Sequence, residues 1–286
     1  MSRTVTAIVL NYCGEDDTAA CVESLYASSY SSLRVLIVDN GSPDGSGERL
    51  RRRFPTSDYL QTGGNFGYAG GNNRGIAWAL DRRADYVLVV NDDAVVDPGC
   101  VSALVEAAED CGAAAVAPQI RYFSDPELIQ CGAGRFSPMR ALGVHREYRE
   151  PADVCGPRQT VTFVSGCCVL LRAAAVQQLG AFDESYFAYV EDAELSLRFV
   201  RAGQTLVYEP RARVLHRALP SARPSPFAIR HGDRNRRSLA ARHYGLLGRL
   251  AFALWFYPTR IVHLARYTSH GDWARALATL EATFGR

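Results

Sequence analysis

The chain has 286 residues, of which 48% are hydrophobic and 22% are charged, a balance that predicts a folded globular protein and argues against a disordered one. All 32 basic residues are Arg. Because no Lys is present, mechanisms that need a Schiff-base lysine, a P-loop lysine or a kinase strand lysine are excluded.

The charge is unevenly distributed along the chain, although the formal net charge is only +2. Residues 1–210 hold 18 Arg and 27 acidic residues, whereas residues 211–286 hold 14 Arg, three acidic residues and five of the six His. A basic C-terminal segment of this kind indicates an anionic surface or ligand as its partner. The alternative is a solvated basic face that neutralises the acidic part of the same chain.

The cysteines and the N-terminus both indicate a cytoplasmic protein. The eight Cys include no CxxC pair and no Cys/His spacing of the zinc type, so we expect reduced and mostly buried thiols. A predicted strand begins within a few residues of the N-terminus, which leaves no room for a signal peptide.

Strand and helix patterns alternate through the first part of the chain. Apolar runs predict strands, and helical patterns lie between them. The strands are expected at 4–12, at 33–39 and in the segment 85–99, where the strand ends in acids, and the helices at 16–28, 44–54, 76–82 and, with Asp97 as its cap, to about Cys111. Continuous apolar strands are buried on both faces, so these runs predict a mostly parallel sheet in an α/β fold.

The second part of the chain is less regular. Strands are expected at 113–118, 161–171, 204–210 and 212–216, and helices at 191–202 and, as two or three segments, over 227–286. Residues 119–160 are rich in Gly, Pro and charge, which predicts loops and irregular strands that cover a site.

The apolar segment 246–267 raises the question of a membrane helix. Arg249, Pro258, Arg260 and His263 interrupt it well before the roughly 20 apolar residues that a bilayer span needs. Its aromatic residues and flanking Arg are typical of a helix that lies in a membrane interface. The alternative is that its apolar face packs on the main domain.

Polar clusters follow the predicted strands, where ligands of open α/β sheets bind. Asn11 follows the first strand, and Asp39 follows the second, where its carboxylate could accept a hydrogen bond from the N3–H of uracil or thymine. The glycine-rich segment 63–75 does not have Rossmann or P-loop spacing, but it offers backbone N–H groups to a diphosphate. Taken singly, each cluster is also compatible with an ordinary turn or loop.

The strand expected in the segment 85–99 ends in the sequence Asn91-Asp92-Asp93. Carboxylates at the end of a buried strand repel each other unless a partner neutralises them, and a divalent cation with oxygen ligands does so. An acidic turn before a helix is the alternative, and it suits Asp97 better than this pair.

With these clusters in order, residues 4–217 resemble a family 2 glycosyltransferase of the GT-A fold, especially the rhamnosyltransferase-like branch. The resemblance rests on the motifs "VDNGS", "GGNFGYAGGNNRGI", "NDDAVV", "FVSGCCVLLR", "FDESYFAYVEDAELSLRFVRAG" and "VLH". It implies a Rossmann-like, mostly parallel central sheet flanked by helices, with a donor-binding part at about 1–97 and an acceptor and catalytic part at about 98–217. A basic helical extension is expected over 218–286.

The resemblance also implies an inverting transfer from a nucleoside-diphosphate sugar to an acceptor hydroxyl. The implied donor-binding residues are Asn11, Asp39, Asn40, Asn65, Gly67, Asn72 and Asp92. A divalent cation, Mn²⁺ or Mg²⁺, is expected at Asp93 and His216. The first position of the family's DxD motif is the amide Asn91 here.

The carboxylates at the start of the 191–202 helix match the family's ED motif. Asp192 is therefore expected to be the base that takes the acceptor proton, and Glu191 to orient the acceptor or the base. Ser165, Gly166 and Arg198 are the expected acceptor-binding residues. The alternative is that these acids only complement the helix dipole.

The resemblance favours a dTDP- or UDP-sugar donor, with dTDP-L-rhamnose first, and implies no nucleic-acid partner. The acceptor is expected to be a polyprenyl-linked glycan at the inner face of the plasma membrane, to which the basic tail would bind peripherally, or else a small molecule. Oligomerisation is left open. Two rivals stay open as well: a sugar nucleotidyltransferase, and a GT-A-like protein that binds nucleotide or glycan without turnover.

Overall fold

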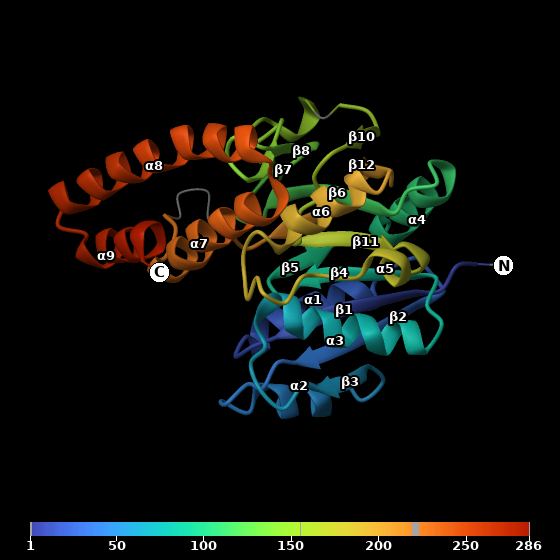
Figure 1. Cartoon of the computed structure of the whole chain (residues 1–286). Coiled ribbons are helices and arrows are strands. Elements are labelled where there is room, and N and C mark those ends of the chain that lie inside the picture. The colour runs from blue at the N-terminus through green and yellow to red at the C-terminus, as the bar shows by residue number, and fades with distance from the viewer. Residues whose placement is uncertain (1, 155, 219–222, 286) are drawn as a thin grey trace.

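The computed structural model describes residues 2–154, 156–218 and 223–285 (Figure 1). The helices are α1 (Glu15–Tyr26), α2 (Ser46–Arg53), α3 (Gly67–Asp81), α4 (Cys100–Asp110), η1 (Ala152–Val154), α5 (Ala173–Leu179), α6 (Glu191–Arg201), α7 (Pro226–His243), α8 (Leu246–Ser269) and α9 (Trp273–Phe284). The strands are β1 (Val5–Asn11), β2 (Leu33–Asp39), β3 (Asp58–Gln61), β4 (Tyr86–Asn91), β5 (Ala94–Val96), β6 (Ala115–Tyr122), β7 (Asp125–Cys131), β8 (Gly134–Ser137), β9 (Leu142–His145), β10 (Gln159–Val161), β11 (Cys168–Arg172) and β12 (Leu206–His216).

A mixed sheet forms the centre of the molecule, with strand order β10-β12-β6-β11-β4-β1-β2-β3. Strand β5 pairs with β12 and β7 pairs with β6. On the main path only β10 and β11 run against the other six strands. The predicted α/β fold with a mostly parallel sheet is therefore confirmed.

Helices cover both faces of this sheet, which explains why its central strands are apolar throughout. Side chains of α1, α2 and α4 pack on one face, and side chains of α3, α5 and α6 pack on the other. Strand β4, at the centre, has five buried residues in succession before it ends at Asn91.

Several elements differ from the sequence prediction. The helix expected over 76–82 begins at Gly67, inside the glycine-rich segment, and β3 and α5 were not predicted. The helix expected from Asp97 begins at Cys100, because Asp97 first closes a turn by accepting hydrogen bonds from the N–H groups of Gly99 and Cys100. The strand expected over 161–171 is two strands, β10 and β11. The two strands expected over 204–216 form one, β12, with a register shift between Glu209 and Arg213.

The C-terminal helices α7, α8 and α9 extend to one side of the sheet (Figure 1). Their inner side chains, among them Leu239 and Phe256, join Tyr186 and Val190 of the loop before α6 in a third apolar core. The predicted helical extension is thus present, and one face of α8 packs on the rest of the molecule. Within the described ranges, no helix is both long and apolar enough to cross a bilayer.

Candidate active site

The parallel strands place their polar ends at one edge of the sheet. Asn11 of β1 lies opposite Asp39 of β2, and Leu10 lies opposite Asn91 of β4. The register therefore brings Asn11, Asp39 and the Asn91-Asp92-Asp93 sequence together, as expected for the carboxyl ends of adjacent parallel strands.

Asn11 and Asp39 are buried and hydrogen-bonded to each other. The Asn11 amide nitrogen also donates to the hydroxyls of Ser42 and Ser46, and Oδ1 of Asp39 accepts from the Ser42 backbone. The Asp39 Oδ2 atom accepts from Gln61. These contacts tie three loops together, so Asn11 acts by holding Asp39 and its neighbours in place.

The glycine-rich segment is held by Asn40. Its amide nitrogen donates to Asn65 Oδ1 and to the Gly67 carbonyl, both at 3.1 Å, and its Oδ1 accepts from the Phe66 N–H. Gly67 has a φ of +69°, and a Cβ there would lie 2.2 Å from the carbonyl oxygen of Phe187. Only glycine fits this close approach, which places the start of α3 against the loop that leads to α6.

Asn72 lies on α3 and is fully buried. Its amide nitrogen donates to the Tyr68 carbonyl, while its Oδ1 has no hydrogen-bond partner among the described residues. The structure thus leaves one buried acceptor at this predicted donor-binding residue.

Asp93 and His216 meet although 123 positions separate them, because β5 pairs with the end of β12 and sets His216 opposite Ala94. His216 Nε2 lies 3.0 Å from Asp93 Oδ1, and His216 Nδ1 lies 2.8 Å from Gln130 Oε1. In the tautomer that donates from Nδ1 to Gln130, His216 presents Nε2 beside a carboxylate oxygen of Asp93.

That donor set fits a divalent cation. A ligand histidine commonly donates its other ring N–H to a neighbouring oxygen, as Gln130 permits here. In the described ranges no three His, Cys, Asp or Glu side chains converge as a metal site. Two protein ligands are sufficient for Mg²⁺ or a similar ion that is held largely by substrate phosphates.

Asp92 lies beside this pair and close to Gly14, where a Cβ would stand 2.7 Å from Asp92 Oδ2. Burial raises the pKa of Asp92 to about 7, with smaller contributions from the charges of Asp93 and Asp17. The neighbouring Asn91 Oδ1 is buried without a hydrogen-bond partner among the described residues. This corner of the site therefore gathers buried oxygen atoms, for which a cation would be a suitable partner.

The turn before α6 is strained. Tyr189 and Val190 have φ values of +69° and +77°, a left-handed conformation that a β-branched residue rarely adopts. The side chain of Asn235 in α7 supports the turn by donating to the carbonyls of Ala188 and Tyr189. Such strain often marks functional sites, and here it sets the start of α6.

Glu191 and Asp192 begin α6 immediately after this turn. Asp192 Oδ2 accepts a 3.0 Å hydrogen bond from the Gly166 N–H, and the Tyr68 hydroxyl donates to the Gly166 carbonyl. Burial raises the pKa of both acids, and the charge of Asp192 raises the pKa of Glu191 further. A carboxylate with a raised pKa is suited to taking a proton near neutral pH.

A short segment joins the two acidic groups. Gly166 contacts Asp192, and the next residue, Cys167, accepts a 2.8 Å hydrogen bond through its carbonyl from the N–H of Asn91. Ser165 Oγ accepts from the Cys167 N–H. Residues 165–167 therefore lie between Asp192 and the Asn91-Asp92-Asp93 corner, as the prediction of a shared site requires.

Arg198 contacts the protein rather than facing this site. Its guanidinium donates to Glu194 and to the carbonyls of Leu179, Gly180 and Ala181, and these contacts use all of its N–H groups. The structure thus gives Arg198 the role of fastening the α5–α6 connection, and we do not retain it as an acceptor ligand.

Several residues of the site were missed by sequence reasoning, namely Tyr68, Gln130 and Asn235. Tyr68 lies within the motif "GGNFGYAGGNNRGI", but its neighbours Gly67 and Ala69 give no indication that its hydroxyl has a role in the site. Gln130 and Asn235 reach the site only through pairings with residues more than 40 positions away. No local pattern identifies such residues.

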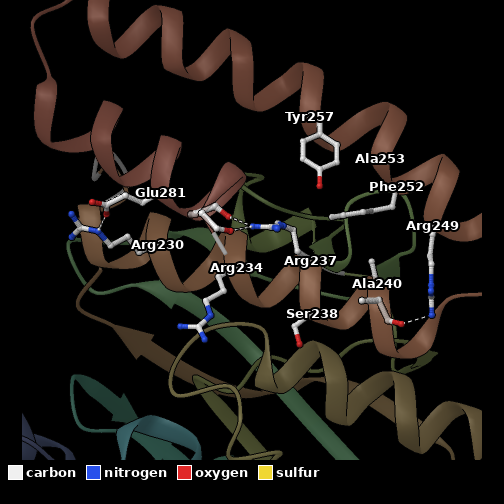
Figure 2. A pocket seen from close by; sticks show the side chains of 13 residues that line it. Arg230, Arg234, Arg237, Ser238, Ala240, Arg249, Phe252, Ala253, Tyr257 and Glu281 are labelled. Carbon is white, nitrogen blue, oxygen red and sulfur yellow. Dashed lines mark hydrogen bonds and ion pairs between the residues drawn. The ribbon is translucent and has the colours of Figure 1, made fainter.

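The cavity in Figure 2 has a volume of 670 Å³ and lies between α7, α8 and α9. Arg230 pairs with Glu281, and Arg237 donates to carbonyls at the end of α9. Arg249 donates to carbonyls at the end of α7. These arginines hold the three helices together, and none of the predicted site residues lines this cavity.

Comparison with known proteins identifies the family. The model of glycosyl transferase family 2 matches residues 6–180. An N-acetylglucosaminyl-diphospho-decaprenol L-rhamnosyltransferase of Mycobacterium tuberculosis is 32% identical over 86% of this chain and 87% of its own length. The low-salt glycan biosynthesis hexosyltransferase Agl10 of Haloferax volcanii is 26% identical over 69% of this chain and 62% of its own length.

Solved structures show the same fold at lower sequence identity. A crystal structure of GalNAc-T7 with UDP, GalNAc and Mn²⁺ aligns with a TM-score of 0.68 and 13% identity, over 88% of this chain and half of that one. The mannosyltransferase PcManGT from Pyrobaculum calidifontis, in complex with GDP-Man and Mn²⁺, aligns with a TM-score of 0.63 and 15% identity over 99% of this chain and 86% of that one. These glycosyltransferases share the GT-A fold with the chain, which belongs to glycosyl transferase family 2.

Proposed function

We propose that the protein is a metal-dependent inverting glycosyltransferase that moves a hexosyl group, with L-rhamnose from dTDP-L-rhamnose as the first candidate, to a hydroxyl of a lipid-linked glycan. The observation that carries the proposal is the placement of Asp192. A partly buried carboxylate with a raised pKa follows a strained turn and is joined through residues 165–167 to the Asn91-Asp92-Asp93 corner. The 32% identity to the mycobacterial rhamnosyltransferase supports the sugar.

In this proposal Asp192 accepts the proton of the acceptor hydroxyl as its oxygen attacks the anomeric carbon. The new glycosidic bond forms on the face opposite the bond to the departing diphosphate, so the configuration inverts. The Gly166 N–H holds the Asp192 carboxylate toward the reacting hydroxyl. Mn²⁺ or Mg²⁺ held by Asp93 and His216 would supply positive charge against the diphosphate.

The donor base is proposed to bind beside Asp39. Asp39 Oδ1 accepts from Asn11 and Ser42, and Oδ2 accepts from Gln61 and, at 3.4 Å, from the Tyr59 hydroxyl, so the N3–H of a uracil or thymine ring would take the place of the long Tyr59 contact. Asn65, Gly67 and Asn72 would line the sugar and diphosphate part of the donor pocket. The unpaired Oδ1 of Asn72 supports this placement.

A lipid-linked acceptor is supported by the exposed apolar side chains of the C-terminal helices. Those of α8 lie on one face of the helix and those of α9 form one stripe; they are Leu246, Leu247, Leu250, Leu254, Ile261 and Val262 of α8, and Trp273, Leu277, Leu280 and Phe284 of α9. The surrounding chain carries the Arg excess of residues 211–286. Apolar faces bordered by Arg suit the surface of a bilayer that contains anionic lipids, and we propose peripheral binding there, on the cytoplasmic side.

Thermal unfolding with nucleotides tests the donor part of this proposal. UDP, dTDP, GDP and CDP are each added with and without Mn²⁺ or Mg²⁺, because a ligand of the folded state raises the midpoint of unfolding. A metal-dependent shift with dTDP or UDP is expected. No shift with any of the four would contradict the donor assignments at Asp39, Asn65 and Asp93.

A transfer assay tests the reaction itself. The protein is incubated with dTDP-L-rhamnose and a polyprenyl-diphosphate-linked amino sugar, and the product is analysed for its anomeric configuration. Transfer with inversion is the expected result. Retention of configuration would contradict the proposed mechanism. Transfer only to water-soluble small molecules would contradict the proposed acceptor.

A further inference from the structure

A second cavity, of 330 Å³, lies where the C-terminal helices meet the catalytic part of the chain. Asp192 lines one side, together with Phe163 and Tyr189. Arg236 of α7 and Arg260 of α8 line it as well. The candidate base and two buried guanidinium groups therefore face the same space, whose volume is within the range of about 300–1,000 Å³ typical of small-molecule sites.

Asp233 holds the two arginines. Arg260 Nη1 donates to both Asp233 oxygens at 2.7 and 2.8 Å, and Arg236 Nη1 donates to Oδ1 at 3.1 Å. Aromatic rings also hold the guanidinium groups, since Arg236 lies 5.3 Å from the ring centre of Trp255 and Arg260 lies 5.4 Å from that of Phe256. The positions of both arginines are thus fixed before any ligand arrives.

This cluster has more positive charge than its one carboxylate balances. The exposed fractions of the Arg236, Arg260 and Asp233 side chains are 7%, 11% and 5%. Arg236 Nη2 and Arg260 Nε are buried without a hydrogen-bond partner among the described residues. Burial, the largest cause, lowers the pKa of Arg236 to about 10, and the charge of Arg260 lowers it further. Buried N–H donors without a protein acceptor favour a bound group that accepts hydrogen bonds, such as an anion.

The chemistry and the location of the cavity indicate which anion. Guanidinium groups bind phosphate oxygens in a fixed fork geometry, and this chain has no Lys for that purpose. The leaving diphosphate of the donor lies on the face of the sugar opposite the base in an inverting transfer. Cationic groups on the side of Asp192 are therefore placed for the acceptor rather than for the donor.

We propose that the cavity between Asp192 and the Arg236–Arg260 pair is a subsite for the phosphate or diphosphate group of the acceptor. This inference rests on the proposed function and deepens it, because it makes the acceptor a phosphorylated glycan and assigns its anionic group to named residues. The group is supplied either by a lipid-linked diphosphate sugar or by a water-soluble phosphorylated sugar.

Calorimetric titration with pyrophosphate in EDTA tests the subsite without the cation-dependent donor site. Arg236→Met and Arg260→Met are each expected to weaken pyrophosphate binding at least tenfold. Arg234→Met is the matched control, because Arg234 is an exposed arginine of α7 and its loss changes the net charge equally. The affinity of this variant for pyrophosphate should stay within twofold of wild type. Wild-type affinity in both cavity variants, or an equal loss in the control, would overturn the proposal.

Asp233→Asn decides the question if the arginine variants do not fold. Removing this carboxylate frees guanidinium N–H groups and raises the positive charge of the cavity, so pyrophosphate should bind at least threefold more tightly. If the cluster served only to join α7 to α8, the same change would leave pyrophosphate binding unchanged or weaken it. Either of those results would overturn the proposal.

Acceptor kinetics test whether the subsite binds the phosphate group of the acceptor. A lipid-linked diphosphate sugar, its short-chain soluble analogue and the methyl glycoside of the same sugar are compared as acceptors. Arg260→Met should raise KM at least tenfold for both diphosphate acceptors. The kcat for all three acceptors and the KM for the methyl glycoside should change less than threefold. Equal effects on all three would contradict the phosphate subsite.

The wild-type enzyme then distinguishes the two sources. A much lower KM for the lipid-linked acceptor than for its soluble analogue would identify a lipid-linked group, and equal KM values would identify a soluble phosphorylated sugar. If the wild-type protein transferred no sugar to any acceptor, the proposed function would fail, while the pyrophosphate titration would still decide the subsite.

Discussion

At the scale of single residues, the neighbouring acids Glu191 and Asp192 are in different environments. Asp192 accepts a hydrogen bond from the Gly166 N–H, which favours its charged form. Glu191 is 6% exposed, and its Oε2 has no hydrogen-bond partner among the described residues. Its pKa is raised well above the usual range by burial and by the charge of Asp192. Of the two acids, Glu191 is therefore expected to hold a proton more strongly, and Asp192 to ionise first.

Isosteric amide substitutions test these roles. Asp192→Asn is expected to lower kcat by about 10²–10⁴-fold, the usual contribution of a general base, because an amide cannot take the acceptor proton. Glu191→Gln resembles the protonated acid and should change kcat less than tenfold. Both variants should bind dTDP or UDP as wild type does. Equal losses of kcat in the two variants would contradict the assignment.

The raised pKa of Glu191 also predicts how stability depends on pH. Because its pKa is higher in the folded than in the unfolded state, its contribution to stability is fully present below the unfolded pKa and is lost as pH rises through the folded pKa. Glu191→Gln does not titrate, so its free energy of unfolding should rise relative to wild type between about pH 5 and about pH 8. Urea unfolding at both pH values measures the difference, and a constant difference would refute the prediction.

At the scale of elements, the site depends on contacts between segments that approach closely. The start of α3 lies against the loop before α6, where the Tyr68 N–H donates to the Phe187 carbonyl at 2.7 Å. Asn235 of α7 holds the same loop from the other side. The position of Asp192 therefore depends on α3 and on α7, which are far apart in the sequence.

Two glycines with similar backbones separate steric contact from backbone strain. Gly67 has a φ of +69° and no room for a Cβ, whereas Gly63 has a φ of +82° and nothing within 4 Å. Gly63→Ala should cost about 1 kcal/mol of stability from the left-handed conformation alone. Gly67→Ala should cost roughly 3 kcal/mol or more and also lower transfer activity. Equal costs in denaturant unfolding would contradict the close contact with Phe187.

Removal of the Asn235 side chain tests the support of the strained turn. Asn235→Ala leaves the carbonyls of Ala188 and Tyr189 without these donors, so the free energy of unfolding should fall by about 1–3 kcal/mol. The kcat should fall as well, because Asp192 follows the turn directly, whereas nucleotide affinity should be unchanged. A parallel loss of nucleotide affinity would show that the effect is not local to the turn.

At the scale of the whole molecule, the C-terminal helices carry two kinds of surface. Their inner side contributes to the third apolar core and to the cavity beside Asp192. Their outer side exposes apolar side chains, among which Leu247 and Leu254 are 81% and 79% exposed. If this outer side binds a bilayer, the cavity that we assign to the acceptor phosphate belongs to the same group of helices as the lipid surface.

Liposome flotation tests the bilayer as the partner of that surface. The double variant Leu247→Gln and Leu254→Gln should bind vesicles with anionic lipids at least tenfold more weakly, since each buried Leu contributes about 1.5–3 kcal/mol. Met139→Gln, which changes an exposed apolar residue of the catalytic part, should bind as wild type does. Unchanged flotation would contradict bilayer binding through these side chains. A wild-type dimer that the double variant abolishes would identify a second copy of the chain as the partner.

Local patterns in the sequence were sufficient for the strands β1, β2, β4 and β6, the order of the polar clusters and the acids at the start of α6, because apolar runs and turn residues depend on near neighbours. They also carried the family resemblance, which the comparisons confirmed. The resemblance implied that Asp93 and His216 meet, and the pairing of β5 with β12 shows how they do so. The tertiary structure alone decided that the N–H groups of Arg198 are taken by protein acceptors, and that Asn235, Arg236 and Arg260 lie near Asp192. The physical reason is that these contacts join residues far apart in sequence, and their partners are selected by strand register and helix packing, which no local pattern records.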